Sequence, residues 1–259
     1  MHTRGRAPPV PGRSQVPPHL VAHRGYARRY PENTLLALRE AVAAGARYLE
    51  FDVQLSADGV PVLLHDADLA RTSGAPGCVF DLPVTTLRQC TVGEPTRFGN
   101  RFRGEMISTL AEVAAWLATV PMVTAFVEVK GESLWRFGSE AVHTAIWQAL
   151  GPARAQSVLI AYDDAFLFAA RLAAPVRIGW IVPVWDAEYE RRARALTPDF
   201  LIIDRTRLPS ATLPPGSWEW MVYEVDDADQ ALALGQRGIG FVETMAIGEL
   251  LADARLRPP

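Results

Sequence analysis

Short apolar runs alternate with amphipathic segments along most of the chain. Runs such as 157–162 (SVLIAY), 177–182 (RIGWIV) and 200–204 (FLIID) are apolar on both faces, which predicts strands of a sheet that helices cover on both sides. The segments between such runs repeat apolar residues at helical spacing, and this spacing predicts amphipathic helices. The predicted strands are 19–23, 48–55, 124–130, 157–162, 177–182, 200–204, 220–225 and 240–243, and the predicted helices are 33–44, 110–118, 140–150, 165–173, 187–196 and 228–236.

Eight strands that alternate with helices favour a closed parallel barrel over an open doubly wound sheet. The length agrees, because the 259 residues of the chain are close to the ~250 that such a barrel typically needs. The predicted fold class is therefore α/β, as a single (β/α)8 TIM barrel with a long loop or insertion after strand two. We assign residues 18–255 to this one domain, and residues 1–17, which are rich in proline and arginine, to a flexible lead-in.

The region 66–107 interrupts the alternation. It follows a turn at 56–59 and an extended run at 60–65, and it has weak periodicity with many Gly, Pro, Thr and Arg residues. Long connections of this kind are uncommon and often functional, so the region is a candidate lid or specificity loop. No GxGxxG motif follows the first strand and no GxxxxGK[ST] motif occurs, so neither a dinucleotide site nor a P-loop is indicated.

The overall charge gives little attraction to large charged partners. The formal net charge is −3, so we expect no nucleic-acid partner, and an anionic small molecule would need a local positive site. The first residues lack the apolar segment of a secretory signal, and no run of about 18 apolar residues predicts a membrane span. We therefore expect a soluble, cytoplasmic protein without stable membrane insertion, and the sequence leaves its oligomeric state open.

Polar side chains gather near the carboxyl ends of the early strands, where barrels of this class carry their functional residues. They close the first and third predicted strands, lie late in the second or end the extended run after it: His23, Arg24, Glu50, Asp52, His65, Glu128 and Lys130. Glu50 and Asp52 are two residues apart, as are Glu128 and Lys130, so each pair points to one side of its strand. If both pairs face the barrel axis, three carboxylates converge on one point.

Three converging carboxylates repel one another unless a cation lies between them. Oxygen ligands of this type suit Mg²⁺ or Ca²⁺ better than Zn²⁺, and the sequence does not separate the first two. With that cation, Arg24 and Lys130 would form a positive pocket for phosphate oxygens. Histidines beside a bound phosphodiester suit general acid–base catalysis near neutral pH. The combination of His23 and His65 with the carboxylates therefore predicts a metal-dependent phosphodiesterase.

Each of these residues also fits a structural role when it is taken alone. A single histidine at a strand end can be structural, and two acidic residues on a strand can form a solvated face. Glu32 precedes a predicted helix, so helix-terminus electrostatics could explain it, and Asn33 could be the N-cap. The joint placement of the polar residues at consecutive strand ends favours a functional site.

The segment 21–74 strongly resembles the glycerophosphodiester phosphodiesterase family, and the likeness continues to residue 130. Several spaced motifs carry it in order: HRG at 23–25, PENT at 31–34, ExD at 50–52, DG at 58–59, HD at 65–66, LxRT at 69–72 and FVEVK at 126–130. The resemblance implies a TIM barrel with metal ligands Glu50, Asp52 and Glu128. It also implies that His23 and His65 act as acid and base, that Arg24 and Lys130 contact phosphate, and that Glu32 helps to hold the site.

The family hydrolyses deacylated phospholipids such as glycerophosphocholine and glycerophosphoethanolamine to an alcohol and sn-glycerol 3-phosphate, which implies the same small-molecule substrates here. The second half departs from the family pattern, with Ala161-Tyr162, Tyr223-Glu224 and Glu243-Thr244 at strand ends that lie around the substrate. The carboxylate of Glu224 near the mouth suggests a cationic head group. Two alternatives remain, a lysophospholipase D or sphingomyelinase D-like activity and, in another class, a non-catalytic phosphate-binding barrel.

Overall fold

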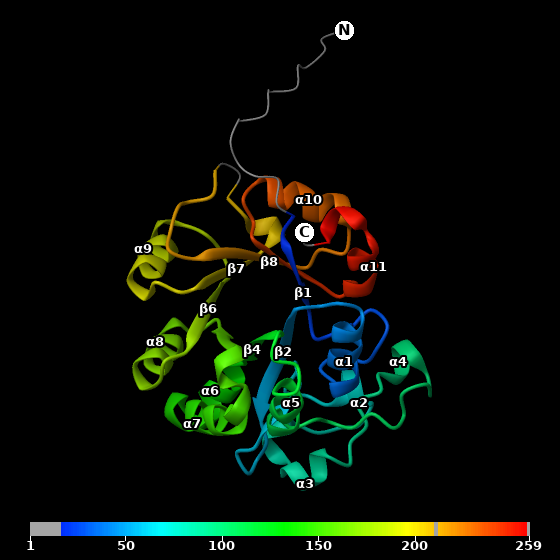
Figure 1. Cartoon of the computed structure of the whole chain (residues 1–259). Coiled ribbons are helices and arrows are strands. Elements are labelled where there is room, and N and C mark those ends of the chain that lie inside the picture. The colour runs from blue at the N-terminus through cyan, green and yellow to red at the C-terminus, as the bar shows by residue number, and fades with distance from the viewer. Residues whose placement is uncertain (1–16, 210–211, 258–259) are drawn as a thin grey trace.

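The computed structural model describes residues 17–209 and 212–257. Its sheet contains eight parallel strands in sequence order, and β1 pairs with both β2 and β9, so the sheet closes into a barrel. Figure 1 shows the helices around the outside of these strands. The parallel strands are β1 (His19–Ala22), β2 (Tyr48–Leu55), β4 (Thr124–Val129), β5 (Ser157–Ala161), β6 (Arg177–Val182), β7 (Phe200–Asp204), β8 (Glu219–Tyr223) and β9 (Phe241–Thr244).

The predicted (β/α)8 barrel is therefore confirmed, and its eight strands are those expected from the apolar runs. Strands 48–55, 177–182 and 200–204 have the predicted bounds, and the others differ by one or two residues at one or both ends. Of the lead-in predicted for residues 1–17, residues 1–16 lie outside the described residues.

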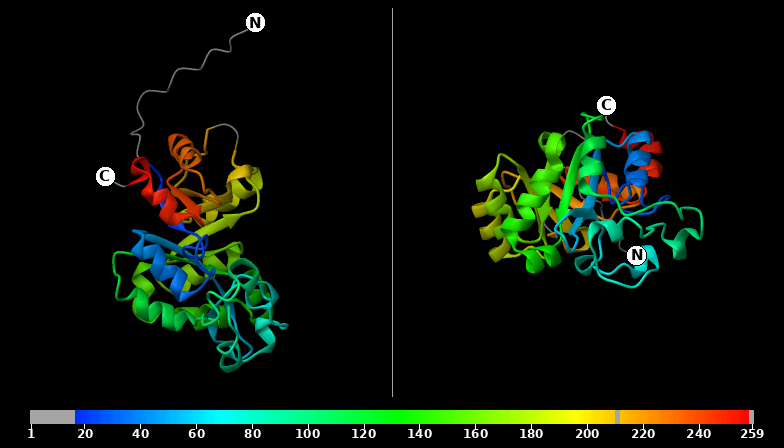
Figure 2. Two further views of the ribbon diagram at one scale, coloured as in Figure 1. Left: turned by 90° about the vertical axis from the view of Figure 1, so that its right-hand side faces the viewer. Right: turned by 90° about the horizontal axis from the view of Figure 1, so that it is seen from below.

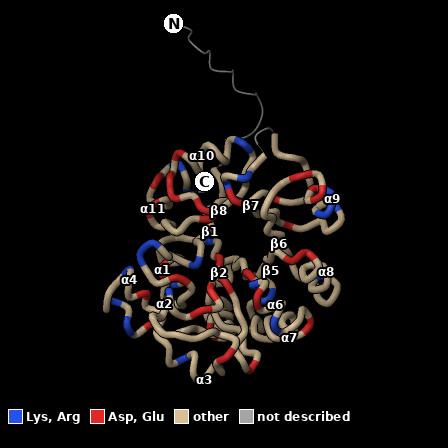
Figure 3. Tube along the Cα trace, turned by 180° about the vertical axis from the view of Figure 1, so that it is seen from behind, with Lys and Arg blue, Asp and Glu red and all other residues tan. Residues whose placement is uncertain are grey.

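The interior of the barrel is apolar at one end and charged at the other. An inner cluster of buried side chains contains Phe126, Phe200 and Phe241, whose rings meet edge to face with centroids 4.9 to 6.2 Å apart. Phe126 and Glu128 are two residues apart on β4, so both point inward and the charged residue lies nearer the carboxyl end. Figure 3 shows acidic positions along the chain beside β2.

In the described part of the chain, eight helices follow or flank the barrel strands. Six of them match predicted segments: α1 (Leu35–Ala43), α5 (Leu110–Leu117), α7 (Ser139–Leu150), α8 (Asp164–Ala173), α9 (Ala187–Leu196) and α10 (Ala228–Gln236). Two were not predicted, α6 (Gly131–Phe137) and α11 (Ile247–Ala252). Both are short, six or seven residues, and α6 buries only Ser133 and Leu134, so neither repeats an apolar stripe often enough to reveal a helix. No described helix is long and apolar enough to cross a membrane.

The insertion is an ordered unit with a small core of its own. It follows β3 (Pro61–Leu63), which pairs antiparallel with β2, and it contains four short elements: α2 (Ala70–Ser73), the 3-10 turn Val79–Asp81, α3 (Val84–Leu87) and α4 (Pro95–Phe98). Seven buried apolar side chains between Val62 and Ile107 form its core. Figure 2 shows it, in cyan to green, beside the barrel. The predicted insertion after strand two is confirmed, and its role as a lid or specificity loop stays a prediction.

Candidate active site

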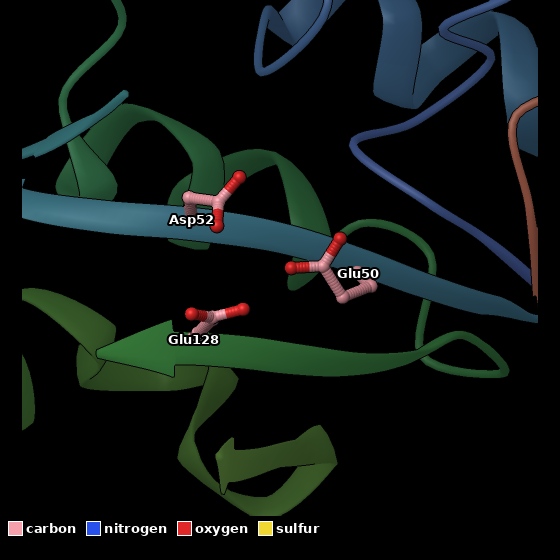
Figure 4. Close-up of side chains that lie close together, drawn as sticks. All are labelled: Glu50, Asp52 and Glu128. Atoms are coloured by element: carbon pink, nitrogen blue, oxygen red, sulfur yellow. The ribbon is translucent and has the colours of Figure 1, made fainter. Parts of the chain in front are cut away.

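Three carboxylates converge where β2 and β4 pair, as their spacing predicted. Asp52 pairs in register with Glu128 on the neighbouring strand, and Glu50 lies two residues earlier on the face shared with Asp52. Ligand oxygens of the three residues all lie within 4.8 Å of one another. Figure 4 shows the three side chains facing the same space between the two strands. This geometry can hold a metal ion.

The buried charges of this carboxylate trio are not fully compensated by the protein. Burial and the charge of Asp52 raise the pKa of Glu50 well above its ordinary value, and burial also raises the pKa of Glu128. The pKa of Asp52 is lowered instead, because Lys130 and Arg24 outweigh the effect of its burial. Two buried oxygens, Oε1 of Glu50 and Oδ1 of Asp52, accept no hydrogen bond. Oxygen donors of this kind fit a hard divalent cation.

Two permanent cations lie against the trio. The Nζ atom of Lys130 is 2.8 Å from Oε1 of Glu128 and 3.3 Å from Oδ1 of Asp52. The Nε atom of Arg24 is 3.2 Å from Oδ2 of Asp52, and the backbone N–H of Arg24 donates to Oε2 of Glu50 at 3.0 Å. Arg24 and Lys130 are therefore brought to the point where the sequence expected a phosphate-binding pocket.

His23 is buried among three carboxylates. Its Nε2 atom is 3.7 Å from Oε2 of Glu50 and 3.9 Å from Oε2 of Glu243, and its Nδ1 atom is 3.3 Å from Oε1 of Glu224. Burial alone would lower the pKa of His23, but Glu224 and Glu50 outweigh it and raise this pKa to about 9. Burial raises the pKa of Glu243 to about 7. Sequence reasoning had placed Glu224 and Glu243 near the substrate, but not in contact with a histidine.

His65 lies beside the same space, on the chain that leaves β3. Its Nδ1 atom is 2.6 Å from Oδ1 of Asp66, and its side chain is about one-third exposed. The Asp66 carboxylate also accepts from Arg71, on α2 of the insertion. The sequence motifs contained Asp66 and Arg71 but gave neither a role.

Glu32 lies behind Arg24. Its buried carboxylate accepts from Nη1 of Arg24 at 3.0 Å and from both terminal nitrogens of Arg71 at 2.9 and 2.7 Å. The explanation by helix-terminus electrostatics is not needed, because α1 begins three residues later and the carboxylate is bound to arginines. The implied role of Glu32 in holding the site stays a prediction.

Asn33 is not the N-cap of α1. The N-cap is Thr34, whose hydroxyl accepts from the backbone N–H of Ala37 at 3.0 Å. Asn33 has φ of 55° and aims its amide at Asp52, donating to Oδ2 at 2.8 Å and accepting from the Asp52 backbone N–H at 3.0 Å. The side-chain amide therefore fixes one member of the carboxylate trio, a role that an Asn before a helix does not reveal in sequence.

A cavity of about 140 Å³ lies at this point, and we call it the catalytic cavity. It is lined by His23, Arg24, His65, Glu128, Lys130, Ile160, Tyr162, Ile181, Ile202, Tyr223, Glu224 and Glu243. The hydroxyl groups of Tyr162 and Tyr223 are 3.2 Å apart across its mouth. The cavity thus combines two imidazoles, two cations and several carboxylates at the carboxyl end of the barrel.

Comparison with known proteins links this site to one family. A family model described as the glycerophosphoryl diester phosphodiesterase family matches residues 23–160. The chain is 39% identical over 113 residues to glycerophosphodiester phosphodiesterase 1 of Bos taurus, covering 44% of this chain and 34% of that protein. It is 40% identical over 94 residues to a glycerophosphodiester phosphodiesterase of Caldanaerobacter subterraneus, covering 36% of this chain and 38% of that protein. The matches therefore span little more than a third of these curated relatives.

Solved structures share the fold over almost the whole chain. An Oleispira antarctica phosphodiesterase in complex with the product sn-glycerol-3-phosphate superposes with a TM-score of 0.78 at 24% identity, covering 91% of this chain and 96% of that one. A glycerophosphodiester phosphodiesterase from Agrobacterium tumefaciens gives a TM-score of 0.73 at 22% identity, covering 91% and 99%. At these identities the likeness shows the barrel fold.

Proposed function

Because the chain belongs to the glycerophosphoryl diester phosphodiesterase family, we propose that it hydrolyses glycerophosphodiesters, such as glycerophosphocholine or glycerophosphoethanolamine, to an alcohol and sn-glycerol 3-phosphate. The single observation that carries the proposal is that His23 and His65 line one cavity together with Glu128, a member of the converging carboxylate trio. A barrel of this class carries its chemistry at the same end. A barrel that only binds phosphate would not need two imidazoles beside a group of carboxylates that can hold a metal ion.

Glu50, Asp52 and Glu128 are the residues that would hold a divalent cation, Mg²⁺ or Ca²⁺. The two buried oxygens without hydrogen bonds and the oxygen-only donor set support this assignment. When bound, such an ion supplies positive charge to the non-bridging phosphate oxygens. Asn33 keeps Asp52 in place for this role through its two hydrogen bonds.

Arg24 and Lys130 would bind the phosphate group. Both line the catalytic cavity and both carry permanent positive charge, which a diester with one negative charge requires. The guanidinium of Arg24 offers a planar fork to two oxygens, while the ammonium of Lys130 acts as a point charge. Glu32 would act behind Arg24, holding its guanidinium, because its oxygens already accept from two arginines.

His23 and His65 would move the protons. One imidazole takes a proton from the attacking oxygen, that oxygen forms a bond to phosphorus, and the bond to the alcohol oxygen breaks. The other imidazole gives a proton to the departing alkoxide. The attacking oxygen is either water or the neighbouring glycerol hydroxyl, the second by way of a cyclic phosphate that water then opens. The Nδ1 atom of His65 faces the Asp66 carboxylate, which leaves its Nε2 for proton transfer. His23 faces carboxylates with both ring nitrogens, Glu224 at Nδ1 and Glu50 and Glu243 at Nε2.

Glu224 would favour a cationic head group. Its side chain lines the catalytic cavity and is 43% exposed, so a choline or ethanolamine group can approach its carboxylate. The measurement is the ratio of kcat/KM for glycerophosphocholine to that for glycerophosphoinositol. The ratio should fall several-fold in Glu224→Gln, and an unchanged ratio would refute the assignment, since any shared effect through His23 cancels in it.

The test of the function is a release assay for sn-glycerol 3-phosphate with a panel of glycerophosphodiesters and lysophosphatidylcholine, with and without EDTA. We expect turnover of the glycerophosphodiesters that EDTA abolishes and Mg²⁺ or Ca²⁺ restores. His23→Ala and Glu50→Ala should each abolish turnover, while Arg88→Gln, on the exposed side of the insertion, should retain it. Activity in the metal-free enzyme would overturn the mechanism, and activity confined to lysophosphatidylcholine would favour the lysophospholipase D alternative.

A further inference from the structure

We propose that Arg71, in the insertion, is a positioning residue that couples the acid–base residue His65 to the phosphate-binding residue Arg24. The inference rests on the proposed function of the catalytic cavity. It comes from the guanidinium of Arg71, whose three nitrogens all donate to the carboxylates of Asp66 and Glu32. Asp66 in turn contacts His65, and Glu32 contacts Arg24.

The first arm of this coupling runs to His65. The Nε atom of Arg71 donates to Oδ2 of Asp66 at 2.5 Å, and the other oxygen of Asp66 is 2.6 Å from Nδ1 of His65. Arg71 therefore fixes the carboxylate that holds the ring. With Nδ1 engaged, the ring orientation determines where Nε2 lies, and proton transfer depends on that position.

The second arm runs to Arg24. The terminal nitrogens of Arg71 donate to the two oxygens of Glu32 at 2.9 and 2.7 Å. Glu32 in turn accepts from Nη1 of Arg24 at 3.0 Å. Arg24 has φ of 54°, so its backbone is held in the left-handed region that most residues avoid. Its guanidinium is held by Glu32 at Nη1 and by Asp52 at Nε, and Arg71 acts on it through Glu32.

The insertion fixes Glu32 from a second direction as well. Oε1 of the buried Glu94 accepts from the backbone N–H of Glu32 at 2.6 Å. Arg97 donates to Oε2 of Glu94 and to the backbone oxygen of Ala27, both at 2.6 Å. The insertion therefore holds both the backbone and the side chain at this point. It behaves here as part of the catalytic framework, because these contacts are to the loop that carries Arg24.

Arg71 itself is not needed to fill a core. Its side chain is 44% exposed, so shortening it opens no apolar cavity and should affect activity more than folding. Only an arginine offers three donor nitrogens in one plane, whereas a lysine has a single ammonium and cannot reach both carboxylates with the same geometry. The charge alone is therefore not sufficient for the proposed role.

The experiment measures kcat and KM for glycerophosphocholine in Arg71→Gln, Arg71→Lys, Asp66→Asn and Glu32→Gln, with the inhibition constant of glycerol 3-phosphate as a report on Arg24. A shift of about 1 Å in a catalytic group costs on the order of 100-fold in rate, so we expect Arg71→Gln to lower kcat by roughly 10- to 100-fold and to weaken glycerol 3-phosphate binding. Asp66→Asn should lower mainly kcat, and Glu32→Gln should weaken mainly binding. Arg71→Lys should not restore either.

Arg88→Gln is the matched control, because Arg88 is an exposed arginine of the same insertion with one carboxylate partner, Glu112. It should keep wild-type kcat and KM, and thermal melting should show all the variants folded. Arg71→Gln values within about twofold of those of Arg88→Gln would overturn the inference, as would full activity of Arg71→Lys.

A wild-type enzyme inactive on every diester would refute the proposed function instead. The coupling is then tested by NMR of the His65 imidazole nitrogens, because this measurement shows which ring nitrogen carries the proton and does not require an active enzyme. We expect a single tautomer with the proton on Nδ1 in the wild type and a mixture of tautomers in Arg71→Gln. An unchanged tautomer in Arg71→Gln would overturn the coupling.

Discussion

Replacing Glu50 by glutamine should stabilise the metal-free protein and destabilise the metal-bound one relative to wild type. The ligand oxygens of Glu50, Asp52 and Glu128 are at most 4.8 Å apart. Two unit charges at that distance repel by roughly 3.5 kcal/mol at an effective dielectric constant of about 20. Arg24 and His23 offset part of the repulsion on Glu50, so we expect Glu50→Gln to raise the free energy of unfolding by about 1–2 kcal/mol in EDTA. The amide oxygen can still accept from the Arg24 backbone N–H.

The direction follows from the raised pKa of Glu50, which burial and Asp52 cause. A carboxyl whose pKa is raised on folding favours the folded state while it is protonated, and this contribution is lost as the pH rises through the folded pKa. The advantage of the glutamine should therefore be present near neutral pH and absent in acid. For a chain of this size 1 kcal/mol corresponds to a Tm shift of about 2–4 °C.

Excess Mg²⁺ or Ca²⁺ should reverse the order. An ion that binds only the folded wild type stabilises it by about 2.7 kcal/mol at a hundred times its Kd, and the glutamine variant lacks one ligand. Differential scanning calorimetry in EDTA and in metal measures both effects, and Glu132→Gln, on the exposed face of α6, is the control. A variant that melts below wild type in EDTA, or that gains as much from the metal as wild type does, would refute the reasoning.

Three substitutions around the site should have graded effects. Asn33→Ala removes both hydrogen bonds to Asp52 and leaves a non-glycine, non-asparagine residue at φ of 55°, so we expect a loss of roughly 1–3 kcal/mol in urea unfolding and weaker metal binding by calorimetry. Gly25→Ala places a Cβ 2.7 Å from the backbone of Ala37 at φ of +80°, so the variant should lose most turnover in the release assay, and wild-type kcat would contradict this. Ser133→Ala leaves two buried partners on β2 without their hydrogen bonds and should cost about 1–3 kcal/mol, which urea unfolding would show with an unchanged slope.

The barrel and the carboxylate trio could be predicted because each rests on a simple period. Strands buried on both faces are continuous apolar runs, and their number suggests the barrel. Alternation along a strand places Glu50 and Asp52 on one side, and the parallel partner brings Glu128 beside them. These relations depend only on the spacing of residues along the chain, so the sequence alone is enough to predict them.

The supporting contacts could not be predicted because they join segments far apart in the chain without any period. Arg71 meets Glu32 across 39 residues, and Glu94 meets the same residue across 62. The insertion that carries them has weak periodicity, so nothing in its pattern says which way its side chains point. Asn33 has the identity of a capping residue, and only its backbone conformation directs the amide to Asp52 instead.

The charge balance at the catalytic cavity bears on the order of binding. Five carboxylates, Glu50, Asp52, Glu128, Glu224 and Glu243, lie in or directly behind the cavity, against the two permanent cations Arg24 and Lys130. With all five carboxylates ionised, these groups leave a net negative charge even when His23 is protonated, and burial together with this excess raises the pKa values of Glu50, Glu128 and Glu243. Lys130 and Arg24 are each paired with a carboxylate of the trio. Glu50, Asp52 and Glu128 would hold a divalent cation, whose charge would offset theirs and leave Arg24 and Lys130 for phosphate, so an anionic diester should bind more weakly without that cation. It follows that EDTA should weaken substrate binding as well as turnover, and calorimetric binding of glycerol 3-phosphate with equal affinity in EDTA and in Mg²⁺ or Ca²⁺ would contradict this order.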